Sequence, residues 1–247
     1  RMGVNVDIID ETKPLDGYKL VVAPMTYMLR PGYADRVRDF VAAGGTYVTT
    51  YVSGWVNETD LCFLGGFPGP LRDVLGVWCE ETDALRPQDS NEILWRGKTY
   101  TLHEIAELAH AETAQPEGIY LHDFYEGFPA VTRNAFGRGR AFYIAARMDD
   151  DFQLDFFSAL CAELAIAPSL PTTANATANV SDALPALPYG VTATMRTDGE
   201  KDYVFVMNFT PRAIEVDLGA GGVDMSTSVP VSGSYTLPPR GLLIFAR

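Results

Sequence analysis

Ser53 is the first residue of this sequence whose type and position could support nucleophilic chemistry. It lies in the stretch YVSGW, residues 51–55, directly after an apolar, β-branched run. A nucleophile elbow follows the pattern G-x-S-x-G, which allows a sharp turn between a strand and a helix. Tyr51 and Trp55 occupy the two glycine positions here, and no histidine follows in a recognisable setting. The pattern therefore favours a hydroxyl group that satisfies a turn over a catalytic nucleophile.

Histidine and cysteine side chains are the next candidates, because both can bind zinc. The histidines lack the H-E-x-x-H pattern, and the cysteines lack C-x-x-C spacing. A sparse, odd number of cysteines is typical of reduced thiols in a cytoplasmic protein. We therefore expect no metal, no cofactor and no disulfide. The side chains concerned are His103, His110, His122, Cys62, Cys79 and Cys161.

Carboxylates are abundant, so a glycosidase pair has to be considered. Such a pair places two carboxyl groups about 5–10 Å apart around one sugar. Glu80 and Glu81 are adjacent, and on a strand they would point to opposite faces. The aspartates of MDDDF, 148–152, suit the start of a helix better than a cation site. The glycine-rich stretches 65–70 and 137–140 lack the phosphate-binding patterns. We therefore assign no catalytic residue.

The composition indicates an ordinary globular protein and excludes two classes of partner. The 247 residues are 47% hydrophobic and 21% charged, with a net charge of −13. That charge opposes binding to nucleic acid or to an anionic membrane. No window of about 18 residues is apolar throughout, so we expect no membrane-spanning helix.

The first 52 residues have the pattern of an α/β domain with a parallel sheet. Apolar runs at 4–10, 18–24 and 46–52 predict strands, of which 18–24 suits a strand buried on both faces. Residues 30–45 predict a helix that Gly44 and Gly45 end. Strand, helix and strand in this order form a βαβ unit. The apolar face of the helix is Val37, Phe40 and Val41.

Later segments add hairpins, a helix and an all-β module. Two strands are expected around the Arg96–Gly97 turn, and a hairpin over 129–146. Residues 103–113 are ambiguous between helix and strand, and 118–125 suit a strand. An amphipathic helix is expected over 149–166. We expect a first domain over 1–168, a linker over 169–187 and a small antiparallel β domain over 188–247.

The segment 58–85 follows the strand at 46–52, where loops of open α/β sheets form binding crevices. Its glycines and prolines at 65–70 give a backbone with little ordering cost on association. Leu61, Leu64 and Leu75 suit a contact surface and a cover for the domain's own sheet equally well. Aromatic residues are enriched at interfaces, so we name four as a candidate interface. They are Trp55, Phe63, Phe67 and Trp78.

Two resemblances are carried by longer motifs. The strand–helix order and AAGGTYV, 42–48, resemble glutamine amidotransferase-like (flavodoxin-like) domains, which have helices on both faces of a parallel sheet. The catalytic cysteine and the His-x-Glu pair of those enzymes are absent. The stretches 44–85, 127–152, 187–210 and 235–247 closely resemble glycoside hydrolase family 42 β-galactosidases.

The second resemblance implies a function for nearly the whole chain. Family members begin with a TIM barrel that holds both catalytic glutamates, followed by an amidotransferase-like trimerisation domain and a small β domain. This chain resembles only the last two parts, and by this resemblance we expect the trimerisation domain to be truncated before its usual first strand and helix. The resemblance implies an assembly region without activity of its own. Its partners would be other copies in a homotrimer and the barrel of a cytoplasmic parent enzyme that hydrolyses terminal β-D-galactosides.

Two other functions remain open from the sequence. The first is an independent amidotransferase-like hydrolase that uses Ser53 or a cysteine. The second is a carbohydrate-binding module in which Tyr189, Tyr203 and Tyr235 stack on sugar, although such tyrosines more often pack a β-sandwich.

Overall fold

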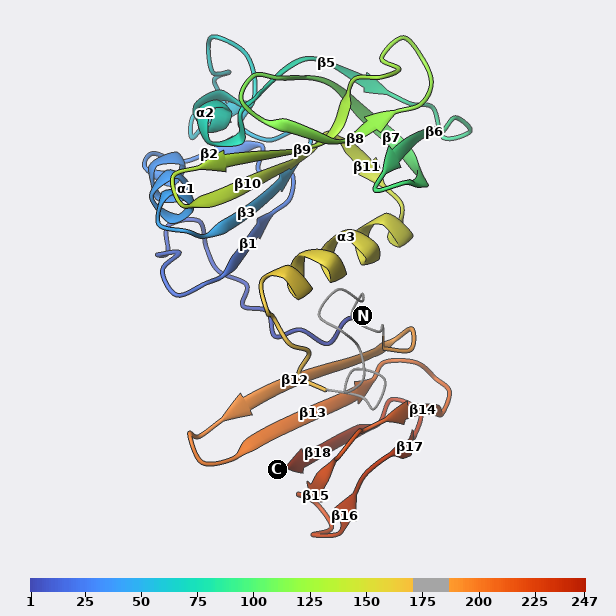
Figure 1. The fold of residues 1–247 in the computed structure, drawn as a ribbon. Coiled ribbons are helices and arrows are strands. Elements are labelled where there is room, and N and C mark those ends of the chain that lie inside the picture. The colour runs from blue at the N-terminus through green and yellow to red at the C-terminus, as the bar shows by residue number, and fades with distance from the viewer. Residues whose placement is uncertain (171–186) are drawn as a thin grey trace. The chain divides into compact units, whose positions relative to one another are not determined.

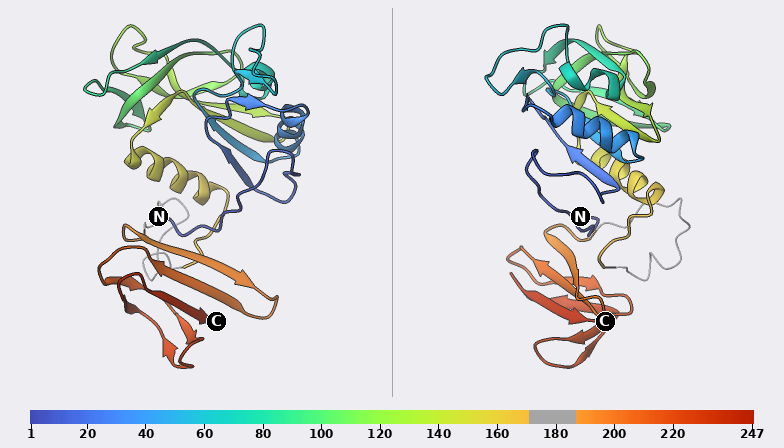
Figure 2. Two further views of the ribbon diagram at one scale, coloured as in Figure 1. Left: turned by 180° about the vertical axis from the view of Figure 1, so that it is seen from behind. Right: turned by 90° about the vertical axis from the view of Figure 1, so that its left-hand side faces the viewer.

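The computed structural model describes residues 1–170 and 187–247, which form two compact units (Figures 1 and 2). One unit comprises Ile9–Phe152, and the other comprises Arg1–Ile8 with Gln153–Arg247. Most of the expected linker, 169–187, lies outside the described residues. A mixed sheet with few helices followed by all-β sheets after residue 190 agrees with the coarse fold class, whereas the expected domain bounds 1–168 and 188–247 remain predictions.

The unit Ile9–Phe152 is built on a nine-stranded mixed sheet. Its order is β1-β3-β10-β9-β8-β6-β7-β11, and β5 also pairs with β7. The strands are β1 (Leu20–Ala23), β3 (Thr46–Thr50), β5 (Val77–Ala84), β6 (Asn91–Trp95), β7 (Lys98–Ala111), β8 (Gln115–Tyr120), β9 (Pro129–Phe136), β10 (Gly139–Ile144) and β11 (Ala146–Met148). A further parallel pair joins β2 (Met28–Leu29) to β4 (Val56–Asn57).

The prediction of a parallel sheet is correct only for one part of this sheet. β3 pairs in parallel with β1 on one side and with β10 on the other, whereas the remaining pairs are antiparallel. Strands joined by tight turns must run antiparallel, because a parallel pair needs a long crossover. Arg96 and Gly97 both have positive φ and form such a turn between β6 and β7. Of the ambiguous residues 103–113, those up to Ala111 belong to β7, so the stretch is a strand and not a helix.

The predicted βαβ unit is confirmed. Helix α1 (Tyr33–Ala42) connects β1 to β3, and its residues Val37, Phe40 and Val41 are buried. The short helix α2 (Arg72–Leu75) shares one core with α1, Tyr47 and Tyr143. These two helices therefore pack on the same face of the sheet.

Two expected strand features are wrong. Residues 4–10 form no strand, and Val6 and Ile8 are exposed, so apolar alternation alone did not give them a pairing partner. β1 was expected to be buried on both faces, but it is the first strand in the sheet order, and Val22 is exposed.

Helix α3 (Asp150–Glu163) agrees with the expectation for 149–166. The Phe152 N–H donates to Asp149 Oδ1 at 2.8 Å, so this aspartate caps the helix start. Phe152, Phe156 and Leu160 are buried on its apolar face.

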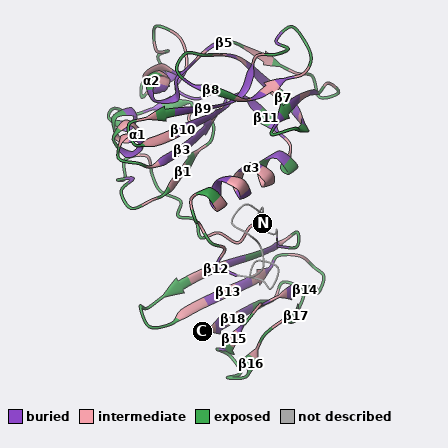
Figure 3. Cartoon of the chain, in the orientation of Figure 1, coloured by how far each residue is buried: buried purple, intermediate pink, exposed green. Residues whose placement is uncertain are grey.

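The second unit contains antiparallel sheets (Figure 3). Its larger sheet has the order β12-β13-β18-β15-β16, and β14 pairs with β17. The strands are β12 (Val191–Thr197), β13 (Asp202–Asn208), β14 (Ile214–Asp217), β15 (Gly222–Asp224), β16 (Pro230–Val231), β17 (Ser234–Leu237) and β18 (Leu242–Ala246). Its core includes Val204, Val206, Leu237 and Phe245.

The three tyrosines of the sugar-binding alternative lie on separate elements of this unit. Tyr189 precedes β12 and is exposed. Tyr203 on β13 donates to Asp198 Oδ2 at 2.9 Å. Tyr235 on β17 is half-buried against the core. Tyr203 and Tyr235 therefore already have contacts within this unit, which suits the structural role that such tyrosines more often have.

Candidate assembly surface

The turn after β3, Tyr51–Trp55, is fixed by buried hydrogen bonds. Ser53 is fully buried, accepts a hydrogen bond from the Thr26 N–H at 3.0 Å, and donates to the Thr50 carbonyl at 2.7 Å. These bonds satisfy the hydroxyl group within the turn. A fully buried hydroxyl in this setting does not offer the exposed position that a nucleophile needs.

Trp55 and Phe67 form an aromatic pair beside this turn. Their rings are stacked, with centroids 4.7 Å apart and planes at 13°. The main-chain N–H of Trp55 donates to the Tyr27 carbonyl at 3.0 Å, and the centroids of the Tyr27 and Trp55 rings are 6.2 Å apart. The pair therefore joins the segment before β2 to the loop that follows β4.

That loop, residues 58–76, is compact, and we call it the aromatic loop. Phe63 and Phe67 pack half-buried against the core of the unit. The Phe63 N–H donates to the Trp55 carbonyl at 3.0 Å. A Cβ added to Gly69 would lie 2.7 Å from the Phe63 ring, so only glycine fits there. Close packing of this kind gives the loop a defined shape.

Trp78 on β5 supports the glycine-rich part of the aromatic loop. Its ring stacks on His110 with centroids 4.8 Å apart, and the Arg72 guanidinium lies 5.9 Å from the ring centre. A Cβ on Gly66 would lie 2.4 Å from Trp78 Nε1. Arg72 also pairs with Glu112, and that hydrogen bond lowers the pKa of the Glu112 carboxyl group. Trp78 is therefore covered largely by its own unit.

Four apolar side chains on the segments next to these aromatic residues remain exposed. Leu61 is 66% exposed and Leu64 is 98% exposed. Tyr27 and Met28 are also exposed, on the segment that pairs with β4. β4 lies between the two segments: it pairs with β2 on one side, and on the other side the Asn57 N–H donates to the Leu61 carbonyl at 2.9 Å. We define the apolar patch as Tyr27, Met28, Leu61 and Leu64.

Exposed apolar residues on a well-ordered base are typical of a contact site. The four aromatic residues named from the sequence are all half-buried. The structure brings Trp55, Phe63 and Phe67 together as a base for the patch. Trp78 lies elsewhere, because its neighbour Cys79 faces the core and successive strand residues face opposite sides. The sequence did not decide whether Leu61 and Leu64 face a partner or the core. It also gave little sign of Tyr27 and Met28, apart from the apolar character of the segment after Pro24.

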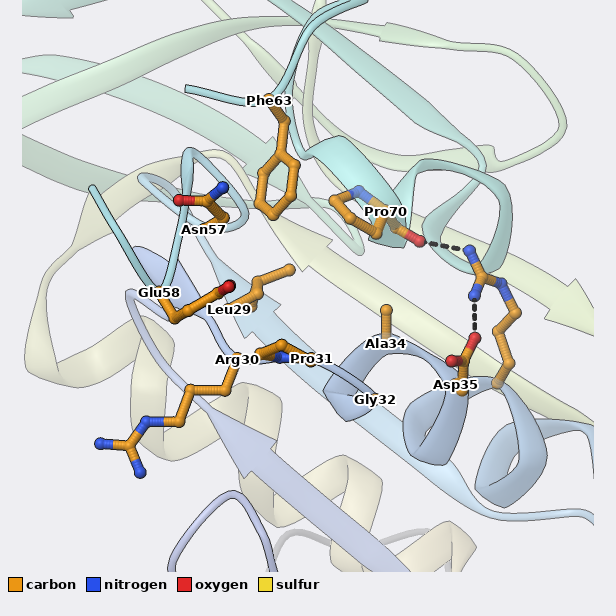
Figure 4. Close-up of a pocket in the computed structure, with 11 residues that line it drawn as sticks. Leu29, Arg30, Pro31, Gly32, Ala34, Asp35, Asn57, Glu58, Phe63 and Pro70 are labelled. Atoms are coloured by element: carbon orange, nitrogen blue, oxygen red, sulfur yellow. Dashed lines mark hydrogen bonds and ion pairs between the residues drawn. The ribbon is translucent and has the colours of Figure 1, made fainter. Parts of the chain in front are cut away.

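A cavity of about 330 Å³ lies beside the aromatic loop (Figure 4). Leu29, Ala34, Phe63 and Pro70 contribute apolar walls. At its edge, Arg38 donates to the Pro70 carbonyl at 2.6 Å and to Asp35 Oδ1 at 2.9 Å. Arg38 thereby anchors the loop to α1. Arg38 also pairs with Asp73 at 2.8 Å, so its charge is balanced by carboxylates of its own unit, which suits a structural role.

The part of the chain that the structure describes contains no group of three or more metal-ligating side chains. Among the same residues, no helix is long and apolar enough to cross a membrane.

Comparisons with known sequences match two families in succession. The family described as the β-galactosidase trimerisation domain matches residues 1–167. The family described as the β-galactosidase C-terminal domain matches residues 190–247.

Individual relatives agree with these family matches. The chain is 45% identical over 256 residues to β-galactosidase BglY of Alicyclobacillus acidocaldarius, and the match covers 100% of this chain and 35% of that protein. It is 40% identical over 254 residues to β-galactosidase Pbg of Clostridium perfringens, with the same coverage. The chain thus spans 35% of the length of these curated relatives.

Solved structures give the same result. A crystal structure of β-galactosidase from Bacillus circulans sp. alkalophilus has a TM-score of 0.87 and 40% identity. One from Rahnella sp. R3 has a TM-score of 0.86 and 41% identity. Each match covers 100% of this chain and 35% of the other chain.

Proposed function

Because the chain belongs to the family of β-galactosidase trimerisation domains and continues into a β-galactosidase C-terminal domain, we propose that it is the non-catalytic assembly region of a β-galactosidase. The observation that carries this proposal is the apolar patch on its anchored aromatic base. Leu64 is almost fully exposed, yet its loop is held by the stacked pair of Trp55 and Phe67. An ordered loop pays little conformational entropy when a partner covers it.

The partner of this patch is another copy of the same protein, in a homotrimer. The strong negative net charge argues against nucleic acid and anionic membrane. The second partner is the catalytic domain of the parent enzyme, which holds the two catalytic glutamates and hydrolyses terminal β-D-galactosides. The parent is cytoplasmic, a proposal supported by three sparse cysteines that are all free.

We also propose that the parallel part of the large sheet belongs to a glutamine amidotransferase-like fold. The order β1, α1, β3 and the parallel pairing of β3 with β10 support this. β1 is the first strand in the sheet order, so among the described residues one backbone edge of β1 has no neighbouring strand and could pair with a further one. An experimental structure of the parent enzyme in which no further parallel strand joins β1 would contradict this proposal.

Two measurements on purified protein test the proposed function. Sedimentation equilibrium of the parent enzyme should give three times the mass of one subunit. A chromogenic β-galactoside should be hydrolysed by the parent and not by the 247-residue chain. A monomeric parent, or turnover by the chain that a point substitution within it abolishes, would overturn the proposal.

A further inference from the structure

Val52 has a backbone conformation that valine rarely adopts. Its φ is 55°, in the left-handed region, and it is the second residue after β3, which ends at Thr50. A β-branched side chain is unfavourable there, because Cβ crowds the neighbouring carbonyl group. Such strain persists only where the surrounding structure fixes it. The turn Tyr51–Trp55 must therefore be held from outside.

The side chain that holds it is Glu107, a buried residue of β7. Glu107 is 1% exposed, and its Oε1 accepts the Val52 N–H at 2.9 Å. Oε1 also lies 3.4 Å from Thr82 Oγ1, and Oε2 accepts the Tyr143 hydroxyl group. Glu107 takes part in none of the ion pairs found among the described residues. A buried carboxyl group without a cation is costly, so the hydrogen bonds that it accepts are its compensation.

The same turn reaches both segments that carry the apolar patch. The Gly54 N–H donates to the Thr26 carbonyl at 2.8 Å, and the next residue, Trp55, donates to Tyr27. A Cβ on Gly54 would lie 2.1 Å from the Pro68 carbonyl oxygen, so the turn and the aromatic loop touch through their main chains. A change in the backbone at Val52 would therefore shift Tyr27, Trp55 and Phe67 together.

We propose that Glu107 is a positioning residue for the assembly surface: its carboxyl group holds the strained Val52 turn, and this turn positions Trp55, whose main-chain N–H donates to Tyr27 of the apolar patch. The role in assembly rests on the proposed function. The hydrogen bond between Glu107 and the Val52 turn does not depend on it. The hydrogen bonds found for the Glu107 carboxyl group go to Val52, Thr82 and Tyr143, so its effect on the patch passes through the main chain of Val52–Trp55.

Three variants separate positioning from general core stability. Glu107→Gln retains an oxygen that can accept the Val52 N–H. Glu107→Leu removes both acceptors with similar volume. Tyr120→Phe is the matched control, because the Tyr120 hydroxyl donates to the carbonyl groups of Glu107 and Ala145 in the same core and does not contact the turn.

Amide hydrogen exchange of the chain measures the turn directly. In Glu107→Leu we expect the Val52 amide to exchange at least about tenfold faster, because its buried acceptor is lost. Glu107→Gln should remain close to wild type, and Tyr120→Phe should leave the 52–55 amides unchanged. If Glu107→Leu has no effect on the Val52 amide, or if Tyr120→Phe accelerates it equally, the proposal is wrong.

Sedimentation of the parent enzyme with the same variants measures the consequence. Glu107→Leu should raise the dissociation constant of the trimer at least about tenfold relative to Tyr120→Phe, with rescue by Glu107→Gln. A faster Val52 exchange with an unchanged dissociation constant would overturn the positioning role. A wild-type parent that is monomeric would instead overturn the proposed function and leave the exchange result intact.

Discussion

The indole ring of Trp55 stacks on the phenyl ring of Phe67, with centroids 4.7 Å apart. This contact closes the aromatic loop onto the turn that follows β3. The stacked pair thereby fixes the loop that carries Leu61 and Leu64. These two leucines are exposed and contribute little to the core. The residues that fold the loop and the residues that make outside contacts are therefore different, and substitutions can separate them.

Phe67→Ala should mainly destabilise the chain. Phe67 stacks on Trp55 and packs half-buried against the core. We expect a loss of about 2–4 kcal/mol in the free energy of unfolding, slightly less than for a fully buried phenylalanine. Urea unfolding measures it, with Leu64→Ala as the control that should change stability by less than about 0.5 kcal/mol. Equal losses in the two variants would contradict this division.

Gly54→Ala should separate steric contact from backbone strain. Gly54 has a φ of 65°, and an added Cβ would lie 2.1 Å from the Pro68 carbonyl oxygen. Gly65 also has a positive φ but has nothing within 4 Å of its Cβ position. We expect Gly65→Ala to lower the free energy of unfolding by about 1–2 kcal/mol, because alanine is strained in the left-handed conformation. Gly54→Ala should cost clearly more, and equal melting temperatures for the two variants would show that the close approach is absent.

The three thiols should differ in reactivity. All three cysteines are free, Cys62 is exposed, and Cys79 and Cys161 are buried. Burial raises the pKa of Cys79 well above its usual range and also raises the pKa of Cys161. Ellman's reagent should therefore label one thiol rapidly in the native chain and three after denaturation without reductant. A denatured count of one would reveal a disulfide and contradict the structure.

Glu107 should make stability depend on pH in an unusual direction for a carboxylate. Burial raises its pKa above 4.5, although hydrogen bonds from Tyr143, Val52, Cys79 and Thr82 oppose the shift. A raised pKa in the folded state stabilises the fold below the unfolded pKa, and this contribution is lost as pH rises through the folded value. Each pKa unit between the two states corresponds to about 1.4 kcal/mol.

Urea unfolding of the wild type and of Glu107→Gln between pH 4 and pH 8 tests this sign. The stability of the wild type relative to Glu107→Gln should fall as pH rises. A difference that stays constant or grows with pH would show that the Glu107 pKa is not raised.

Local sequence patterns predicted several elements because short-range physics decides them. The helical spacing of Val37, Phe40 and Val41 and the Arg96–Gly97 turn each depend on a few neighbouring residues, and both are found as expected. The mixed sheet was not predicted, because the pairing partners of β7 and β10 are set by long-range contacts. Residues 4–10 show the same limit, since their alternation predicts a strand but supplies no partner.

The sequence predicted the aromatic residues of the candidate surface but not which of its apolar side chains are exposed. Composition pointed to the aromatic residues of the loop, but it cannot tell a side chain that packs inward from one that faces solvent. Phe63 and Leu64 are adjacent and both apolar, yet Phe63 packs on the core and Leu64 is exposed. The strain at Val52 had no signal in the sequence, because valine is the usual residue of a strand.

Sedimentation equilibrium of the parent enzyme with Leu61→Ser and Leu64→Ser together tests the central claim most directly. The matched control is Leu242→Ser, an exposed leucine of β18 outside the apolar patch. The account predicts that the double variant weakens the trimer by about 1–3 kcal/mol, as expected for contact residues, while urea unfolding of the chain and the mass of the control enzyme stay unchanged. A double variant that remains as trimeric as the wild type at every concentration would contradict the claim that this patch assembles the protein.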